Sequence, residues 1–214
     1  MKVAVSYSGG KESALSLYRV LQQGHEVVAL ITTYNAEAGR SFFHGLTDEV
    51  LERVSDALKI PMIVVKTGEK SYTEDFGVGL KQAKEMGAQA CVFGDIDVEG
   101  HRDWWTRHCD IQGMEAVFPL WGEKREDVAR EIIDSGIVAT LTVVNTKQLG
   151  ERFLGKRFSK GLAEEIVATG SDICGENGEY HTFVSDGPMF KHPVEFKLGE
   201  PVQVREDFMA REVR

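Results

Sequence analysis

Continuous apolar runs that alternate with helical patterns constrain the fold of this chain more than any other feature of its sequence. Strands of a parallel sheet are covered on both faces, so they read as unbroken apolar runs rather than as alternating patterns. Such runs occupy residues 3–7, 27–33, 62–66, 90–95 and 116–118. Helices are expected at 12–23, 47–58, 72–86, 99–112 and 127–134. Right-handed crossovers then predict an α/β fold with a doubly wound, five-stranded parallel sheet.

The pattern changes after residue 136. A strand is expected at 138–144, short helices follow up to about residue 169, and the segment 193–204 alternates as a hairpin does. We find no clear linker between the two patterns. The sequence therefore predicts a first domain at 1–136 and a smaller, tightly packed α+β lobe at 137–214.

Charge and composition exclude several classes of protein. The chain has 214 residues and a formal charge of −9, which repels a nucleic-acid backbone, so we expect no nucleic-acid partner. No apolar run approaches the roughly 18 residues of a membrane span, and only Met1 precedes the first strand, so a cytoplasmic protein without a membrane partner is expected. The cysteines, Cys91, Cys109 and Cys174, are far apart and are interpreted as small apolar residues of the core.

The first apolar run leads into the segment SGGKES at 8–13, where a helix is expected to begin. The segment fits neither a Walker loop, which needs Ser or Thr directly after the lysine, nor the dinucleotide pattern G-x-G-x-x-G. Two glycines still permit close approach of the backbone, and a lysine, two serines and a helix N-terminus attract an anion. We therefore expect a phosphate cradle here; the alternative is an ordinary glycine turn with a serine cap.

SGGKES resembles the SGGxDS loop of the PP-loop, or N-type, ATP pyrophosphatases. In that superfamily the loop binds the pyrophosphate part of ATP, which is cleaved between its α and β phosphates to activate a carboxylate or carbonyl as an adenylate. The resemblance implies an adenine nucleotide alpha hydrolase-like fold, with ATP and Mg²⁺ as ligands. Glu12 stands where aspartate is usual, but one branch of the superfamily uses glutamate there.

Later strings narrow the resemblance to one family. They are GDI at 94–96, HRDWW at 101–105, FPLWG at 118–122, LGERFLG at 149–155 and CGENGEYHTFVSDGPMF at 174–190. Their order and spacing resemble the diphthine–ammonia ligase family over nearly the whole chain, and GENGEYHT is the most specific of them. Diphthine ligases usually show EGGEYET, so Asn177 replaces a glycine and His181 a glutamate. The pattern looks more like a bacterial-type branch of the family. The altered residues lie where the resemblance places the acceptor substrate.

The resemblance also implies roles for individual residues. ATP is expected to contact Ser8, Gly9, Gly10, Lys11, Glu12, Ser13, Thr32, Gly94 and Asp95. The substrate is expected to contact His44, His101, Arg102, Glu176, Asn177 and Gly178. Lys11 would stabilise charge on the departing pyrophosphate, and either Glu179 or His181 would act as base.

Several of these residues have a second interpretation. Asp95 either orients Mg²⁺ on the phosphates or caps a turn or helix. His101 and Arg102 either meet an anionic group or lie on a helix surface, and GENGEYHT is either a ligand-binding cluster or a polar hairpin loop. The sequence thus predicts an AMP-forming amide ligase that adenylates a carboxylate substrate and transfers ammonia to it.

Three alternatives remain open at this stage. The same ATP chemistry could serve another acceptor, such as a corrinoid-related carboxylate. A tRNA-modifying PP-loop enzyme would show paired cysteines and a basic face, which this sequence lacks. A nucleotide-binding sensor would not need the acidic GENGEYHT cluster. A homodimer is also compatible with the sequence.

Overall fold

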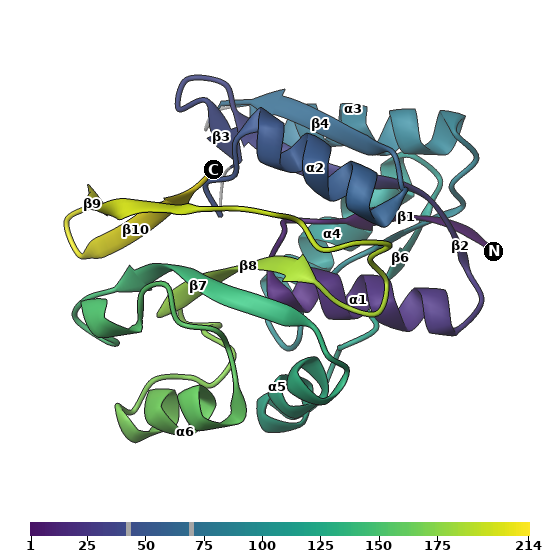
Figure 1. Cartoon of the computed structure of the whole chain (residues 1–214). Coiled ribbons are helices and arrows are strands. Elements are labelled where there is room, and N and C mark those ends of the chain that lie inside the picture. The colour runs from purple at the N-terminus through teal and green to yellow at the C-terminus, as the bar shows by residue number, and fades with distance from the viewer. Residues whose placement is uncertain (42–43, 69–70) are drawn as a thin grey trace.

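The computed structural model describes residues 1–41, 44–68 and 71–214, which form two sheets (Figure 1). The larger sheet contains parallel strands in the order β4-β2-β1-β5-β6. Their bounds are β1 (Lys2–Ser6), β2 (Glu26–Asn35), β4 (Met62–Thr67), β5 (Ala90–Val92) and β6 (Glu115–Val117). The predicted doubly wound parallel sheet is confirmed. A short strand, β3 (Arg40–Ser41), pairs antiparallel with the end of β2, in a segment interpreted from the sequence as a loop.

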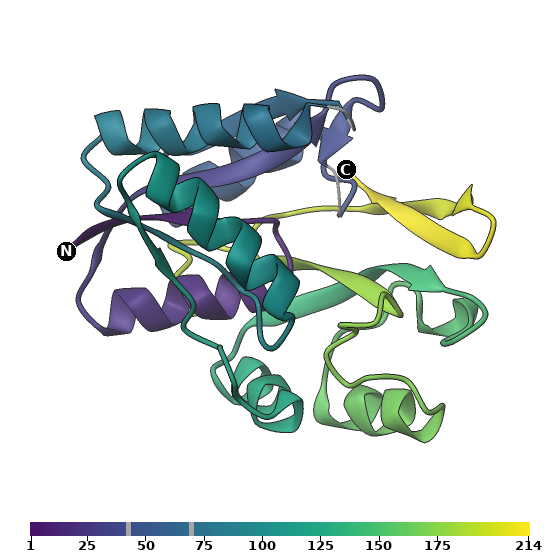
Figure 2. The ribbon, with the colours of Figure 1, turned by 180° about the vertical axis from the view of Figure 1, so that it is seen from behind.

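Helices cover both faces of this sheet. One face carries α1 (Lys11–Gln22) and α2 (Asp48–Leu58), with α5 (Arg125–Asp134) packed against α1, and the other carries α3 (Tyr72–Glu85) and α4 (Glu99–Ile111) (Figures 1 and 2). Alternate residues of β1 supply the two cores, since Val3 and Val5 join one apolar cluster and Ala4 joins the other. This arrangement explains why the strand had to be apolar throughout.

The second sheet is antiparallel, in the order β8-β7-β10-β9. Its strands are β7 (Val138–Asn145), β8 (Tyr180–Asp186), β9 (Leu198–Arg205) and β10 (Phe208–Val213). The short helix η1 (Glu151–Phe153) and α6 (Lys160–Ala168) lie between β7 and β8 in the chain. The hairpin expected at 193–204 is formed later, by β9 and β10.

The second sheet packs beside the first half of the chain, with β8 next to α1 (Figure 1). One apolar core runs through both parts and includes Val5 of β1, Leu141 of β7 and Phe183 of β8. The strands of the two sheets do lie on either side of residue 136. Because the core is shared, the division of the chain into domains at that residue stays a prediction.

Candidate active site

A cavity of about 500 Å³ opens at the carboxyl ends of the parallel strands. Residues after β1 and β5 meet there, which is where the strand order of a doubly wound sheet reverses and where ligands bind in such folds. From the predicted set, the lining includes Ser8, Glu12, Ser13, Thr32, His44, Gly94, Asp95, His101, Glu176 and His181. Residues far apart in the sequence therefore share one wall of one cavity.

The glycine loop between β1 and α1 is tightly packed. Gly9 has a φ of +88°, a conformation that favours glycine, and a Cβ there would lie 2.6 Å from Leu46 Cδ1. A Cβ on Gly10 would lie 2.5 Å from the ring of His44. The Ser8 and Ser13 hydroxyls are 3.2 Å apart, and Ser13 Oγ also donates to the Gly10 carbonyl. The loop thus needs both glycines, and its serines brace the first turn of α1.

Gly94 brings the end of β5 against the same turn. A Cβ at this position would lie 3.0 Å from both the Glu12 carbonyl carbon and the Ser13 nitrogen. Those backbone atoms belong to the N-terminus of α1, where amides have no acceptor within the helix and carry a partial positive charge. The absence of a side chain at Gly94 therefore keeps the strand end close to the helix terminus that faces the cavity.

Strand β8 of the second sheet is hydrogen-bonded directly to the glycine loop. The Val184 amide donates to the Gly9 carbonyl at 2.8 Å, and the Lys11 amide donates to Thr182 Oγ1 at 3.1 Å. His44 Nδ1 lies 2.6 Å from the Thr182 carbonyl, to which it donates. The two halves of the chain are thus joined at the loop itself.

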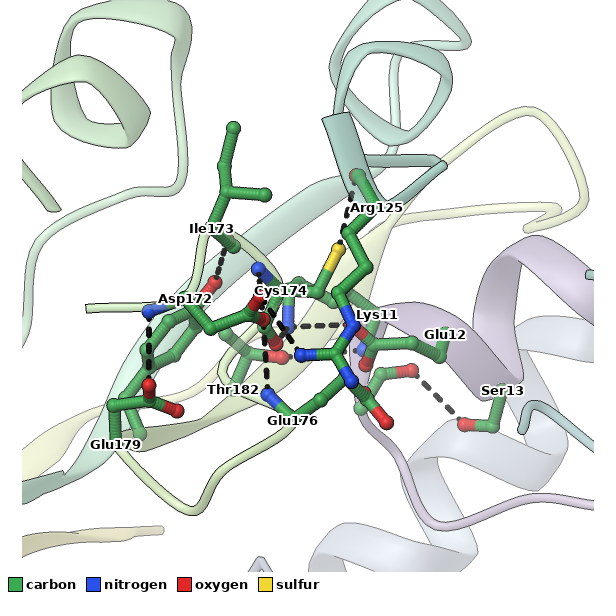
Figure 3. A network of polar contacts seen from close by, with 12 residues as sticks. Lys11, Glu12, Ser13, Arg125, Asp172, Ile173, Cys174, Glu176, Glu179 and Thr182 are labelled. Carbon is green, nitrogen blue, oxygen red and sulfur yellow. Dashed lines mark hydrogen bonds and ion pairs between the residues drawn. The ribbon is translucent and has the colours of Figure 1, made fainter. Parts of the chain in front are cut away.

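Lys11 is not among the residues that line the cavity, and its side chain lies against residues of the second half of the chain, next to Cys174 (Figure 3). It is 2 % exposed, its Nζ donates to the Cys174 carbonyl at 2.5 Å, and it forms an ion pair with Glu12 at 2.6 Å. Nζ also lies 4.5 Å from the centre of the Tyr180 ring. Burial alone would lower the pKa of Lys11, but the Glu12 carboxylate and further groups outweigh it, so the pKa is raised and the ammonium stays charged.

A polar loop at 172–179 carries the ENGE part of the second motif, and two carboxylates shape it (Figure 3). Asp172 Oδ1 accepts the amides of Cys174 and Glu176 at 2.9 and 3.1 Å. Glu179, which is 2 % exposed, accepts the amides of Asp172 and Asn177 at 2.8 and 3.0 Å. Glu179 therefore holds the loop from within, and its predicted role as base stays a prediction.

Arg125 fastens this loop to the first half of the chain. Its guanidinium pairs with Asp97, in the segment after β5, at 2.7 and 2.8 Å, and with Asp172 at 2.9 Å. The Cys174 thiol donates to the Arg125 carbonyl at 3.2 Å, and burial raises the pKa of that thiol. Cys91, Cys109 and Cys174 are all buried and unbridged, as expected of apolar fillers.

Glu176 is the carboxylate that this loop presents to the cavity. Burial and then repulsion by Glu12 raise the pKa of Glu176 to about 8, although Lys11 and Arg125 act in the opposite direction. Burial also raises the pKa of Asp95, against the effect of His101, whose Nδ1 lies 3.1 Å from Asp95 Oδ1. The described lining contains three carboxyl groups, those of Glu12, Asp95 and Glu176, and neither lysine nor arginine.

Two histidines from different parts of the chain lie together at the cavity. The rings of His44 and His181 are 5.3 Å apart and edge-to-face. Burial, followed by the positive charges of Lys11 and Arg205, lowers the pKa of His181 to about 4. Burial, His181 and Lys11 lower the pKa of His44 to about 3. Both imidazoles are therefore neutral at pH 7, and a neutral imidazole can accept a hydrogen bond from a ligand.

Two buried hydroxyls on the cavity wall have no hydrogen-bond partner within the described part of the chain. They belong to Thr32, which was predicted to contact ATP, and to Tyr7, which was not predicted as a site residue. A buried hydroxyl without a partner is costly, and a bound ligand would relieve that cost. Burial also raises the pKa of Tyr7, so its hydroxyl stays a donor. The position of Tyr7 directly before the glycine loop was the signal available in the sequence.

Other predicted residues lie outside the cavity lining as described. Arg102 lies over the Trp121 ring at 4.8 Å, and Asn177 donates its side-chain amide to Glu179 at 3.2 Å. Gly178, Gly9, Gly10, Lys11 and Glu179 do not line the cavity either. Conversely, Thr33, Tyr72, Phe93, Trp104 and Trp105 line it without having been predicted as site residues, and Trp105 stacks on Phe93 with ring centres 4.6 Å apart.

Residues 1–41, 44–68 and 71–214, which the structure describes, contain no cluster of three or more His, Cys, Asp or Glu side chains arranged to hold a metal ion. They also contain no helix with the length and apolar character required to span a bilayer.

Similarity to known proteins is consistent along the whole chain. The diphthamide synthase N-terminal domain matches residues 1–116, and the diphthamide synthase C-terminal domain matches residues 124–209. The diphthine–ammonia ligase of Rattus norvegicus is 27% identical over 94% of this chain and 85% of its own length. The diphthine–ammonia ligase of Homo sapiens is 27% identical over 91% of this chain and 82% of its own length.

A solved structure is also similar in part. It is that of a predicted subunit of tRNA methyltransferase from Methanocaldococcus jannaschii, with 15% identity, a TM-score of 0.48, and coverage of 91% of this chain and 100% of that one. The N-terminal match covers almost all of the larger sheet and the C-terminal match covers most of the second sheet, and together these matches establish the family. The chain belongs to the diphthamide synthase family, whose curated relatives are carbon–nitrogen ligases.

Proposed function

We propose that the protein is an ATP-dependent, AMP-forming amide ligase, which adenylates a carboxylate substrate and transfers ammonia to it. One observation supports this most directly. Ser8 and the first turn of α1, at Glu12 and Ser13, share a cavity with Glu176 and His181, which come from the motif in the second half of the chain. A nucleotide on the loop would therefore lie beside the groups expected to handle the acceptor.

In the first step of this proposal, a carboxylate oxygen of the acceptor attacks the α-phosphate of ATP. The bond from the α-phosphorus to the bridging oxygen breaks, and pyrophosphate leaves. The N-terminus of α1 supplies amides and a partial positive charge for the phosphates, with the Ser8 and Ser13 hydroxyls beside it. Thr32 and Tyr7 have unpaired hydroxyls that the nucleotide can satisfy.

In the second step, ammonia attacks the carbonyl carbon of the acyl adenylate and AMP leaves. The nitrogen then has to lose a proton. His181 lines the cavity and its imidazole is neutral, so it can take that proton, whereas Glu179 is turned into its own loop. We therefore favour His181 over Glu179 as the base.

Mg²⁺ is expected to accompany ATP. The described residues form no preassembled metal site, but Glu12, Asp95 and Glu176 line the cavity with carboxyl oxygens, the donors that Mg²⁺ prefers. Asp95 and Glu176 are the side chains that we assign to hold it. When bound, the ion would neutralise charge on the phosphates.

The acceptor is proposed by class. The curated relatives are named for diphthine and ammonia, and this chain matches both diphthamide synthase domains, so a carboxylate that becomes an amide is the expected substrate. A corrinoid-related carboxylate is the alternative acceptor for a bacterial-type branch, and that branch stays a prediction. We also retain as predictions the domains at 1–136 and 137–214, a cytoplasmic location and a homodimer.

The decisive experiment is ATP–pyrophosphate exchange, screened across candidate carboxylates with Mg²⁺ present. The proposal expects exchange that depends on one acceptor, and AMP with pyrophosphate as products once ammonia is added. Release of ADP and phosphate would contradict it. A nucleotide sensor would bind ATP without exchange with any acceptor, and its ATP affinity would be unchanged by His181→Gln.

A further inference from the structure

The lysine of the glycine loop holds an unexpected position. In SGGKES, Lys11 is the only cation, and its sequence position suggests contact with phosphate. The structure instead buries its ammonium against the Cys174 carbonyl, at 2.5 Å, with Glu12 at 2.6 Å and the Tyr180 ring at 4.5 Å. All of these except Glu12 belong to the second half of the chain.

These contacts stabilise the Lys11 ammonium in its buried position. A buried charge is stable only when it is paired and hydrogen-bonded, and Lys11 has a carboxylate, a carbonyl and an aromatic face around it. Moving Nζ to a phosphate would leave the Cys174 carbonyl without this donor. It would also leave the Glu12 carboxylate without its nearest cation, on the wall of the cavity.

The carbonyl that Lys11 holds lies at a particular point of the polar loop. Cys174 is two residues before Glu176, and its amide is tied to Asp172 Oδ1, which also accepts the Glu176 amide. Fixing Cys174 from one side and Asp172 from the other leaves Glu176 directed into the cavity (Figure 3). Lys11 can therefore set the position of a cavity residue that it does not itself touch in the described contacts.

We propose that Lys11 is a positioning residue, which couples the glycine loop to the polar loop at 172–179 and so holds Glu176 at the cavity, rather than a ligand of the pyrophosphate. This inference rests on the proposed nucleotide site. It assigns phosphate binding to Ser8 and to the start of α1 at Glu12 and Ser13, which line the cavity.

The test compares nucleotide affinity with local hydrogen exchange, using α,β-methylene-ATP with Mg²⁺ as the probe. In the wild type, the proposal expects amide protection in 172–179 to stay the same or rise when the probe binds. A fall in that protection on binding would show that the lysine leaves Cys174 for the phosphates, and would overturn the proposal. If the wild type binds no probe at all, the proposed nucleotide site fails first, and the two failures are distinguishable.

The variant Lys11→Met sharpens the comparison. We expect its affinity for the probe to stay within about threefold of the wild type, while amides in 172–179 exchange at least tenfold faster and those of β2 and β10 are unchanged. Lys11→Arg should restore part of the protection, because a guanidinium can still donate to the Cys174 carbonyl. A tenfold loss of affinity in Lys11→Met with an unchanged loop would overturn the proposal; so would faster exchange throughout the fold. Should this variant fail to fold, the wild-type measurement decides alone.

Discussion

Replacing Glu176 by glutamine should make the protein more stable at alkaline pH and leave it unchanged at acidic pH. In the folded state burial and Glu12 raise the pKa of Glu176 to about 8, from 4.5 for an ordinary glutamate. Between these two values the folded protein keeps a proton that the unfolded chain has released. Stability therefore falls as pH rises through this window, and it is fully retained only below about pH 4.5.

The size of the effect follows from the shift. One pKa unit corresponds to about 1.4 kcal/mol. If Glu176 were isolated and fully desolvated, the free energy of unfolding would fall by roughly that amount for each pH unit across the window. Screening at a partly exposed carboxyl reduces this to about half. From pH 5 to pH 8 the wild type should then lose about 2 kcal/mol relative to Glu176→Gln. Glutamine has a similar size and no charge, so the variant lacks this slope.

The assay is urea unfolding of both proteins at pH 5, 6, 7 and 8, in the presence of a chelator, so that no divalent cation pairs with the carboxylates. Other titrating groups, including His44 and His181, are common to both proteins and cancel in the difference. Glu74→Gln, on the exposed side of α3, is the matched control and should give no pH-dependent difference. A difference for Glu176→Gln that stays constant with pH, or that shrinks as pH rises, would refute the reasoning.

Three further predictions concern the same region. Gly94→Ala should cost about 1–3 kcal/mol in thermal unfolding, because its Cβ meets the backbone of α1, whereas Gly161→Ala, whose Cβ meets nothing within 4 Å, should cost nothing. His181→Gln should reduce the loss of stability as pH falls from 6.5 to about 4, because in this range His181 binds a proton in the unfolded chain but not in the folded protein. Urea unfolding of both proteins at pH 4.5 and 7 checks this. Glu179→Gln should cost about 1–3 kcal/mol and speed hydrogen exchange of the Asp172 and Asn177 amides; unchanged exchange would contradict the assigned contacts.

Local sequence patterns were sufficient for the first sheet and the glycine loop. The apolar runs predicted each parallel strand, because burial on both faces leaves a signal within a few residues. Helix α2 was predicted from the same kind of local information, since Thr47 accepts the Val50 amide and Val50, Leu51 and Val54 form a buried stripe. The two-residue strand β3 was missed, because so short a segment carries no period.

The positions of individual site residues were harder to predict. Lys11 and Glu179 looked like groups that act on a ligand, because lysine and glutamate in a polar motif usually do. Their surroundings are set by β8 and the polar loop, which contact the glycine loop through the packing of the second sheet beside α1. No local pattern encodes that contact, so the sequence could place these residues near the site without showing which way their side chains turn.

The hydrogen bonds between β8 and the glycine loop affect how substitutions in this protein should be interpreted. Thr182 lies 171 residues after Lys11 in the chain, yet it accepts the amide at the first residue of α1. In a mutational scan, substitutions along β8 should therefore have effects similar to those of substitutions in SGGKES, although the two segments lie in different matched domains. Likewise, a chimera that takes one half of the chain from a relative would need a β8 and a glycine loop that can form these hydrogen bonds with each other.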